Sequence, residues 1–423
     1  MAGSNKGRII SWALFDFANT AFYVVILTVG YPLYFKEVVA GESANADFLW
    51  GLSFSVSMVL VAFLSPVLGA AADAGSGKKL YLGIFTALCI AATGGLSFVG
   101  PGMVAGSIAL LVLANVGFEG GLVFYDAFLT ELTTERSYGR VSGYGFAAGY
   151  AGSLITLGVV FPLYVDGFVP ENLGNVRMSF LIAAGMFLLF AIPLFLVVPD
   201  QQKRHRVTLQ ILRQGASRLS QTLHSLGQYK NVARFLSAYF LYIDAINTII
   251  IFSSIFARHS LGFDLTEILL FFALVQTSAL IGSVVFGVLA DHIGHKQSLT
   301  ITLIVWLFIT VTAYFVTDKT TFFVVGFFAG IALGSSQSTS RSLFTAIIPA
   351  EKRTEFFGFY SFFGKASAIL GPLIFGLISS IIDQRTAILS VSVFFIGGLI
   401  LLRYVDVQKP GDPGHPVGPP SIP

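Results

Sequence analysis

Two apolar segments of the chain carry the same trio of polar residues, an acid, an amide and a hydroxyl. The trios are Asp16, Asn19 and Thr20 and, 228 residues later, Asp244, Asn247 and Thr248. In a helix the three side chains of such a D-x-x-N-T trio point within about 100° of one another, on one face. Because a carboxylate in hydrocarbon is stable only when it is paired or protonated, each trio can bind an ammonium group or hold a titratable proton. The alternative is a hydrogen-bonded cluster that joins neighbouring helices.

A third apolar segment carries Asn115, Glu119 and Asp126, spaced by four and seven residues. This spacing places the three side chains within about 40° on one stripe of a helix. Glu119 lies deep in the segment, where burial favours the neutral acid, so we predict that it carries a coupling proton. A permanent ion pair or a hydrogen bond beside the following two glycines is the alternative.

Two basic residues are predicted to face these acids. Arg341 lies four residues after Gln337 and 215 residues after Asp126, with which it is expected to form a gate. Arg341 would otherwise snorkel to the membrane interface. Lys365 lies about 14 Å deep in a later apolar segment, at 1.5 Å per residue. It is predicted to bind a substrate carboxylate, to neutralise the acid of either trio, or to snorkel.

A second repeated motif, G-x-x-x-D followed by glycine and lysine, lies in two short polar connections. Its residues are Gly69, Asp73 and Lys78 in the first copy and Gly287, Asp291, Gly294 and Lys296 in the second. Each acid is expected to accept hydrogen bonds from backbone amides at a neighbouring helix N-terminus, where the helix dipole favours negative charge. The lysines are expected to supply counter-charge, or else only to determine the topology.

The segments that carry these residues are expected to be transmembrane helices. Of the 423 residues 55% are hydrophobic and 11% are charged, against about 25% charged in soluble domains. Apolar runs of about 20 residues recur, and a helix of that length crosses a hydrocarbon core about 30 Å thick. We therefore predict an all-α membrane protein with twelve transmembrane helices.

The repeated motifs divide these helices into two halves, because they recur in the same order in equivalent segments. We predict a six-helix bundle at residues 1–198, a basic linker with an amphipathic helix at 199–231, a second six-helix bundle at 232–404 and a disordered tail at 405–423. Two pseudo-symmetric halves of this kind are typical of transporters that hold their solute between parallel repeats.

The distribution of Lys and Arg predicts the orientation. We count 19 on the side of both termini and of the linker and 5 on the other side, while Lys365 remains within a span. By the positive-inside rule both termini are cytoplasmic, in the cell (inner) membrane. The net charge of +3 follows from this bias, so no nucleic-acid partner is expected.

These motifs resemble the major facilitator superfamily, whose G-x-x-x-D-x-x-G-[RK]-[RK] loop occurs between spans two and three and between spans eight and nine. The first copy departs from the pattern because Gly77 follows Asp73 by four residues, and Lys78 and His295 replace the usual arginine. The sequences W-A-L-F-D-F-A-N-T-A-F at 12–22 and S-R-S-L at 340–343 are similar to the UMF1 group, which includes the Atg22-like vacuolar amino-acid effluxers. The resemblance implies the superfamily fold, amino acids as substrates, and a loop that acts as a latch for the state closed to the cytoplasm.

We therefore predict a secondary transporter that works as a monomer in the lipid bilayer and moves a small-molecule substrate by alternating access, coupled to protons or another ion. A carrier of lipids or amphipathic compounds is the alternative, and an enzyme or receptor is a distant one. No Walker, H-E-x-x-H or G-x-S-x-G motif occurs in the sequence. The six histidines lie in polar connections or in the tail, so neither a metal site nor a cofactor is expected.

Overall fold

The computed structural model describes residues 2–41, 46–73, 77–200, 229–367 and 370–407. Most of the predicted linker with its amphipathic helix, and most of the predicted tail, lie outside these residues.

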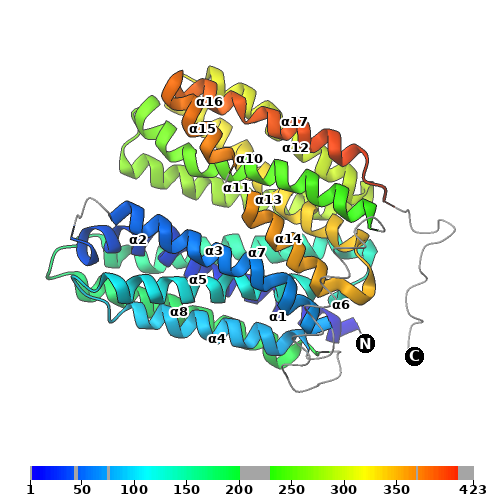
Figure 1. The fold of residues 1–423 in the computed structure, drawn as a ribbon, viewed down its shortest axis with the longest axis horizontal. Helices are drawn as coiled ribbons and strands as arrows, with labels where there is room; N and C mark the ends of the chain where they lie inside the picture. The colour runs from blue at the N-terminus through cyan, green and yellow to red at the C-terminus, as the bar shows by residue number, and fades with distance from the viewer. Residues whose placement is uncertain (1, 42–45, 74–76, 201–228, 368–369, 408–423) are drawn as a thin grey trace.

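The N-terminal half is a bundle of long helices joined by short connections (Figure 1). Its elements are α1 (Ala2–Phe22), η1 (Tyr23–Val29), α2 (Gly30–Tyr34), η2 (Phe35–Val39), α3 (Ala46–Ala71), α4 (Lys78–Leu96), α5 (Val104–Ala127), α6 (Leu129–Leu132), η4 (Glu135–Ser137), α7 (Tyr138–Val160), η5 (Phe161–Tyr164) and α8 (Leu173–Val197).

The C-terminal half forms a second bundle beside the first. Its elements are α10 (Lys230–Ser260), α11 (Leu265–Ile293), α12 (His295–Phe315), α13 (Lys319–Ile347), η7 (Ala350–Lys352), α14 (Arg353–Ser367), α15 (Leu370–Ile381), α16 (Gln384–Ser390) and α17 (Ser392–Arg403).

The first span is one helical rod with two π-helical segments, η1 and η2, on either side of α2. Pro32 lies in α2 and cannot donate a hydrogen bond to the carbonyl four residues before it. π-Helical turns and prolines are the usual places where a long helix changes direction. The sequence of this span therefore contains places at which a helix can change direction.

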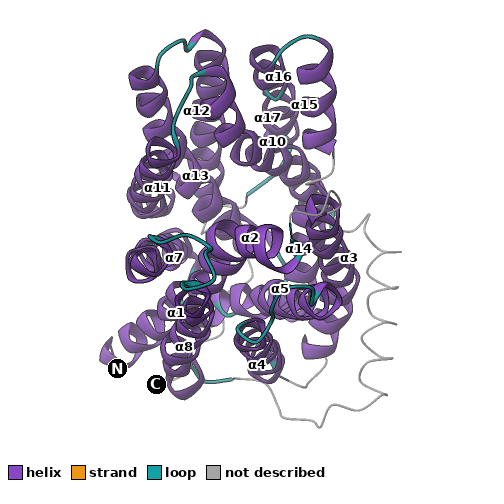
Figure 2. Ribbon diagram, turned by 90° about the vertical axis from the view of Figure 1, so that its left-hand side faces the viewer, coloured by secondary structure: helices purple, strands orange, loops and turns teal. Residues whose placement is uncertain are grey.

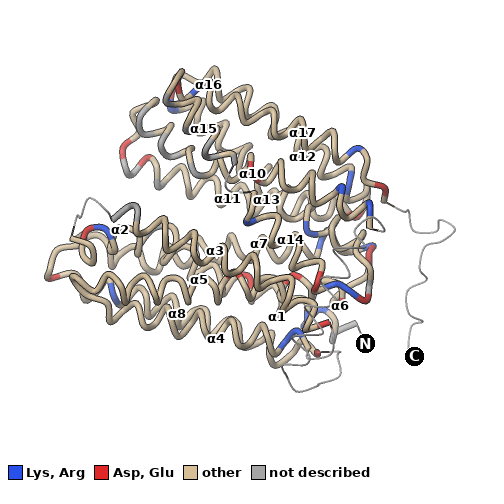
Figure 3. Tube along the Cα trace, viewed as in Figure 1, with Lys and Arg blue, Asp and Glu red and all other residues tan. Residues whose placement is uncertain are grey.

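Ten helical segments of the described chain are long and apolar enough to cross a membrane. The two further predicted spans correspond to α10 and to α14 with α15. Figure 3 shows Lys and Arg concentrated at the end of the molecule where α1 begins and α17 ends, here called the terminal end. The all-α architecture and the two bundles that the sequence predicts are thus present.

The two halves pack closely at the terminal end. There α7 contacts α11 and α13, and α14 contacts α3 and α5 (Figures 1 and 2). A methyl group on Gly143 of α7 would lie only 2.3 Å from the Ser283 carbonyl oxygen of α11, and one on Gly358 of α14 would lie 2.6 Å from Pro66 Cα of α3. Glycine at these positions lets the helices of opposite halves approach, so the terminal end is closed.

Candidate functional site

A cavity of about 690 Å³ lies between the two bundles, within the range typical of small-molecule sites. Its described wall runs from Asp126 and Arg341, toward the terminal end, to Leu33 and Ile268, toward the opposite end. Most of the wall is aliphatic or aromatic. The charged residues of the described wall are Asp16, Glu119, Asp126, Arg341 and Lys365.

Arg341 of α13 crosses between the halves and is 1% exposed. Its Nη1 lies 2.9 Å from Asp126 Oδ1, while Nε and Nη2 donate to the hydroxyl and carbonyl of Ser142 at 2.9 and 2.7 Å. The guanidinium group also stacks 4.0 Å from the centre of the Phe146 ring, and Asp16 Oδ2 lies 3.8 Å from Nη1. The predicted contact with Asp126 is confirmed and the snorkelling alternative is wrong, because the planar guanidinium group satisfies three donors inside the protein. Its role as a gate stays a prediction.

Lys365 of α14 pairs with Glu119 of α5, with 2.5 Å between Nζ and Oε2. The prediction that Lys365 neutralises the acid of a trio is therefore wrong. Those acids have other neighbours, since Asp16 faces Arg341 and Asp244 accepts a hydrogen bond from the Gly371 amide. For Glu119, the ion-pair alternative is the arrangement found, and its proton-carrying role stays a prediction.

The trio in the first span lies at the cavity and also joins helices. All three side chains line the wall. Asn19 donates to Asp16 Oδ1 at 3.3 Å, and the Thr20 hydroxyl donates to the Gly149 carbonyl of α7 at 3.0 Å. Asp16 Oδ2 is buried without a hydrogen-bond partner among the described residues. Both predicted uses of the trio, polar site and interhelical cluster, are thus compatible with its position.

The trio in the seventh span is placed differently. Asn247 lines the described cavity wall, whereas Asp244 and Thr248 lie behind it. The Asp244 carboxylate accepts a hydrogen bond from the Gly371 amide of α15 at 2.9 Å, and the Thr248 hydroxyl donates to the Asp244 backbone carbonyl at 2.8 Å. The sequence repeat therefore does not produce two equivalent polar sites.

Two other predicted pathway residues also differ from each other. Asn115 donates to the Ser57 hydroxyl of α3 at 2.5 Å and is not part of the described wall. Gln337 lines the cavity and accepts a hydrogen bond at 2.5 Å from Tyr150 of α7, which belongs to the other half. The structure therefore brings Gln337 to the cavity and leaves Asn115 in a helix contact.

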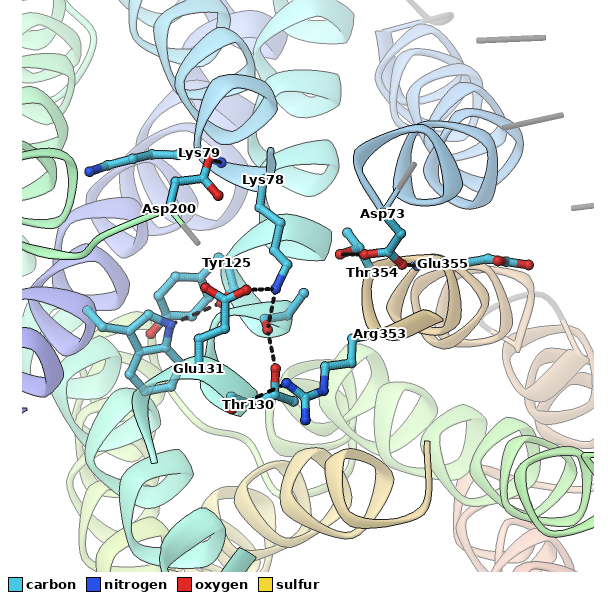
Figure 4. Close-up of polar contacts among 12 residues, drawn as sticks. Asp73, Lys78, Lys79, Tyr125, Thr130, Glu131, Asp200, Arg353, Thr354 and Glu355 are labelled. Carbon is cyan, nitrogen blue, oxygen red and sulfur yellow. Dashed lines mark hydrogen bonds and ion pairs between the residues drawn. The ribbon is translucent and has the colours of Figure 1, made fainter. Parts of the chain in front are cut away.

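The first repeated motif joins α3 to α14 (Figure 4). Asp73 accepts hydrogen bonds from the Thr354 hydroxyl at 2.6 Å and from the Glu355 amide at 2.9 Å, in the first turn of α14. Burial raises the pKa of Asp73, and the two hydrogen bonds oppose this effect. The predicted contact with a helix N-terminus is confirmed.

The second motif makes the equivalent contact between α11 and α7. Asp291 accepts hydrogen bonds from the amides of Gly139 and Arg140 at 2.8 and 3.1 Å, in the first turn of α7. Arg140 Nε adds an ion pair at 2.7 Å. Both motif acids thus cross between the halves at the terminal end, while their role as a latch stays a prediction.

Neither motif lysine pairs with the acid of its own motif in the described structure. Lys78 pairs with Glu131 (Figure 4), and Lys296 donates to the carbonyls of Arg403 and Val405 at 2.9 and 2.7 Å. The charge of Lys78 nevertheless lowers the pKa of Asp73, as expected of a counter-charge, whereas in the second motif Arg140 forms the ion pair with Asp291. Each lysine instead binds within its own half. Lys296 of α12 contacts the C-terminus of α17, where the helix dipole favours a cation.

The structural equivalent of Lys296 is Lys79 rather than Lys78. Lys79 Nζ donates to the Val198 carbonyl at 2.5 Å, just after α8, the last helix of its half. Gly77 and Gly294 precede the two lysine segments and have φ angles of 79° and 102°, which favour glycine. The alignment of the two loops is therefore best made on these glycines.

The other motif glycines allow the close approach of the halves. A methyl group on Gly69 would lie 2.5 Å from the Thr354 carbonyl oxygen, and one on Gly287 would lie 2.6 Å from the Gly139 carbonyl oxygen. Any side chain at either position would push the helix starts away from the motif acids.

Sequence reasoning missed the residues that the motif acids contact. Asp73 contacts Thr354 and Glu355, and Asp291 contacts Gly139 and Arg140. These partner pairs are 215 residues apart, the same offset that relates Asp126 to Arg341. Extending the repeat from the acids to the helix starts would have identified them.

Two six-helix bundles around a central cavity, with duplicated loops at one end, define a transporter of the major facilitator superfamily. Solved structures with this fold include the human organic anion transporter MFSD10 (TETRAN), with a TM-score of 0.75, 14% identity and coverage of 94% of this chain and 99% of that one. The proton:xylose symporter XylE has a TM-score of 0.72, 15% identity and coverage of 96% of both chains. FucP in the outward conformation has a TM-score of 0.68, 15% identity and coverage of 95% of this chain and 100% of that one.

Within this superfamily the chain belongs to the family described as vacuole effluxer Atg22 like, whose model matches residues 41–412. It is 31% identical over 412 residues to the uncharacterized MFS-type transporter YxiO of Bacillus subtilis (strain 168), covering 95% of each chain. It is 25% identical over 291 residues to autophagy-related protein 22 of Kluyveromyces lactis, covering 64% of this chain and 58% of that protein. The chain is therefore a multi-pass membrane transporter and not an enzyme.

Proposed function

We propose that this chain is a secondary transporter of amino acids with apolar side chains, driven by protons and working by alternating access. The halves at 1–198 and 232–404 would rock about the central cavity as two bodies. One observation carries the proposal: a cavity of about 690 Å³ has charged residues of both signs toward its closed end and apolar walls elsewhere. A zwitterion with an apolar side chain matches this division.

Protons are the proposed coupling ion because carboxyl groups lie in the cavity wall. Asp16 and Glu119 both line it, whereas the third predicted candidate, Asp244, lies behind it. Titratable acids between moving halves allow a proton to change the attraction between them. Two superfamily members of similar fold, the proton:xylose symporter XylE and the fucose:proton symporter FucP, are themselves proton symporters.

The proposed setting is the cell membrane, with both termini in the cytoplasm and the monomer as the working unit. The charge distribution supports this orientation, since Lys and Arg gather at the terminal end (Figure 3). In that orientation the structure is closed to the cytoplasm, and the repeated acids Asp73 and Asp291 act as the latch of this state.

A carrier of amphipathic compounds is the second candidate. It is favoured by the aromatic residues of the wall, which include Phe118, Phe252, Phe271, Phe322 and Trp306. Such a surface accommodates an acyl chain as readily as a leucine or phenylalanine side chain.

The test is a counterflow assay with purified protein in liposomes. Radiolabelled leucine, phenylalanine, glutamate, xylose and a lysolipid are each offered to vesicles preloaded with the same unlabelled compound. We expect exchange of leucine and phenylalanine and none of glutamate or xylose. Exchange of the lysolipid alone would replace the amino-acid proposal by the second candidate.

A further inference from the structure

The charged residues of the cavity wall are divided by sign between the halves. The described acids, Asp16, Glu119 and Asp126, belong to α1 and α5, and the described bases, Arg341 and Lys365, belong to α13 and α14. The described ion pairs among these five residues therefore all join one half to the other. A solute that replaces one partner of such a pair also releases a contact between the halves.

Of the two bases, Lys365 is the one that a solute in the cavity can reach. Arg341 is 1% exposed and uses three donors on Asp126 and Ser142. The Lys365 side chain is 25% exposed, and its described ion pair is with Glu119. A lysine ammonium group has three N–H donors on a flexible stem, so it can turn from one carboxylate to another.

We propose, building on the transport function proposed above, that in the empty cavity the Glu119 carboxylate occupies the position beside Lys365 that a solute carboxylate takes during transport. Glu119 leaves this position when its carboxylate is protonated. A proton from water binds the Glu119 carboxylate to form the neutral acid, and its ion pair with Lys365 is lost. The carboxylate of the solute then binds the Lys365 ammonium group. The bond that forms is the O–H bond of Glu119, and it breaks again when the acid returns its proton to water on the other side.

The exchange couples the proton to the solute because neither step is favourable alone. Protonation of Glu119 without a solute leaves Lys365 without the partner of its described ion pair in a largely apolar cavity. A solute carboxylate that enters while Glu119 is ionised places two negative charges on one ammonium group. Proton and carboxylate together restore one ion pair.

The net charge of the described cavity wall favours one class of solute. Three acids against two bases give the described wall one excess negative charge. A proton together with a zwitterion brings this charge to zero, while a proton together with a simple carboxylate leaves it unchanged. The ammonium group of a zwitterion would approach Asp16, whose Oδ2 accepts no described hydrogen bond and lies 3.8 Å from Arg341 Nη1.

The first test measures binding to the purified full-length chain by calorimetry between pH 5.5 and pH 8.5. The probes are leucine, 4-methylpentanoate, which lacks the ammonium group, and leucinamide, which lacks the carboxylate. In the wild type we expect the affinity for the two carboxylates to fall about tenfold for each unit by which the pH rises, since one proton is taken up with each solute. Leucine should bind more tightly than 4-methylpentanoate, and leucinamide should not bind.

The variants separate the two partners of the pair. Glu119→Gln, which mimics the protonated acid, should bind leucine at pH 8.5 as tightly as at pH 5.5. Lys365→Gln should lose at least tenfold in affinity at every pH, and Lys365→Arg should retain binding. Glu267→Gln is the matched control, because it removes another Glu–Lys ion pair, with Lys319, that lies outside the described wall. A wild-type pH slope in Glu119→Gln, or normal binding in Lys365→Gln, would overturn the proposal.

The second test needs no solute. Spin labels at Arg136 and Glu351, exposed positions of opposite halves beside α7 and α14, report the separation of the halves at the terminal end. We expect Glu119→Gln to increase the population with a long distance at least threefold in the empty protein, and Glu267→Gln to leave it unchanged. Unchanged distances in Glu119→Gln overturn the proposal. Longer distances without binding of any probe support release of the ion pair and contradict the amino-acid substrate.

Discussion

At the scale of single residues, Arg341 is a buried cation that contacts both halves of the molecule. Its guanidinium group belongs to the C-terminal half, and its partners Asp126, Ser142 and Phe146 belong to the N-terminal half. A buried ion pair adds little net stability when whole, but removing one partner leaves an unpaired buried charge. Arg341 therefore stabilises the closed arrangement both by neutralising Asp126 and by donating to Ser142.

We predict that Arg341→Ala lowers the free energy of unfolding by about 3–5 kcal/mol, because Asp126 would remain buried without its cation. Arg341→Lys should lose less, since it keeps the charge and loses the bidentate contact with Ser142. Thermal unfolding in detergent checks this order. Arg234→Lys is the control, because Arg234 forms an exposed pair with Asp406 at 3.5 Å and should change stability by less than about 1 kcal/mol. Equal effects at both sites would contradict the inference that the buried contacts of Arg341 hold the halves together.

The sequence predicts which residues carry charge into the membrane, but not always which partner each one chooses. The offset between Asp126 and Arg341 identifies a real contact, because equivalent positions of two pseudo-symmetric halves meet near the axis between them. The partner of Lys365 could not be predicted, since it depends on how α14 lies against α5. Equally, the D-x-x-N-T pattern does not reveal that the Gly371 amide of α15 donates a hydrogen bond to the Asp244 carboxylate.

At the scale of helices, glycines of α7 and α11 bring the backbones of the two helices close together. A methyl group on Gly143 would lie 2.3 Å from a backbone oxygen of α11, and one on Gly287 would lie 3.0 Å from Gly143 Cα. Backbone atoms cannot move aside as a flexible side chain can, so even alanine must separate the two helices. The closed terminal end therefore depends on these glycines.

We predict that Gly143→Ala shifts the protein toward the state open at the terminal end. The distance between spin labels at Arg136 and Glu351 should lengthen in a larger fraction of molecules. Gly158→Ala is the matched control, because Gly158 lies on the same helix and a methyl group there would meet no atom within 4 Å. A similar shift in both variants, or in neither, would show that the close approach does not hold this end closed.

The two motif acids should differ in strength as latches. Asp73 holds the start of α14 through a hydroxyl and one amide, whereas Asp291 holds the start of α7 through two amides and the Arg140 side chain. A carboxylate at a helix N-terminus contributes about 0.3–2 kcal/mol. Both Asp73→Asn and Asp291→Asn should populate the open terminal end, and Asp291→Asn should do so more strongly.

The same pair of spin labels measures this difference, and leucine binding measured by calorimetry serves as a check on folding. Each variant should still bind leucine, because neither acid lies in the described cavity wall. Unchanged distance distributions in both variants would leave the repeated loops with a role in folding or topology only.

At the scale of the whole molecule, the arrangement of charge and the closed end coincide. The contacts between halves through Asp73, Asp291 and Arg341 all lie toward the terminal end, where Figure 3 also shows most Lys and Arg. The cavity runs from there toward the opposite end. The sequence predicts the two bundles because the apolar helices of each half follow the same repeated pattern. It does not predict which end of the molecule is closed, because that depends on small differences between the contacts at the two ends.

The orientation in the membrane can be tested by cysteine labelling in intact cells. We predict that cysteines at Asp166 and Asp318, exposed in connections at the opposite end, react with a membrane-impermeant maleimide, because the positive-inside rule places that end outside. A cysteine at Glu351, exposed at the terminal end, should react only after permeabilisation. The natural Cys89 is 0% exposed and gives no background. Labelling of Glu351 but not of Asp166 in intact cells would invert the topology, and the structure would then be closed to the outside, with Glu119 taking up its proton from the cytoplasm.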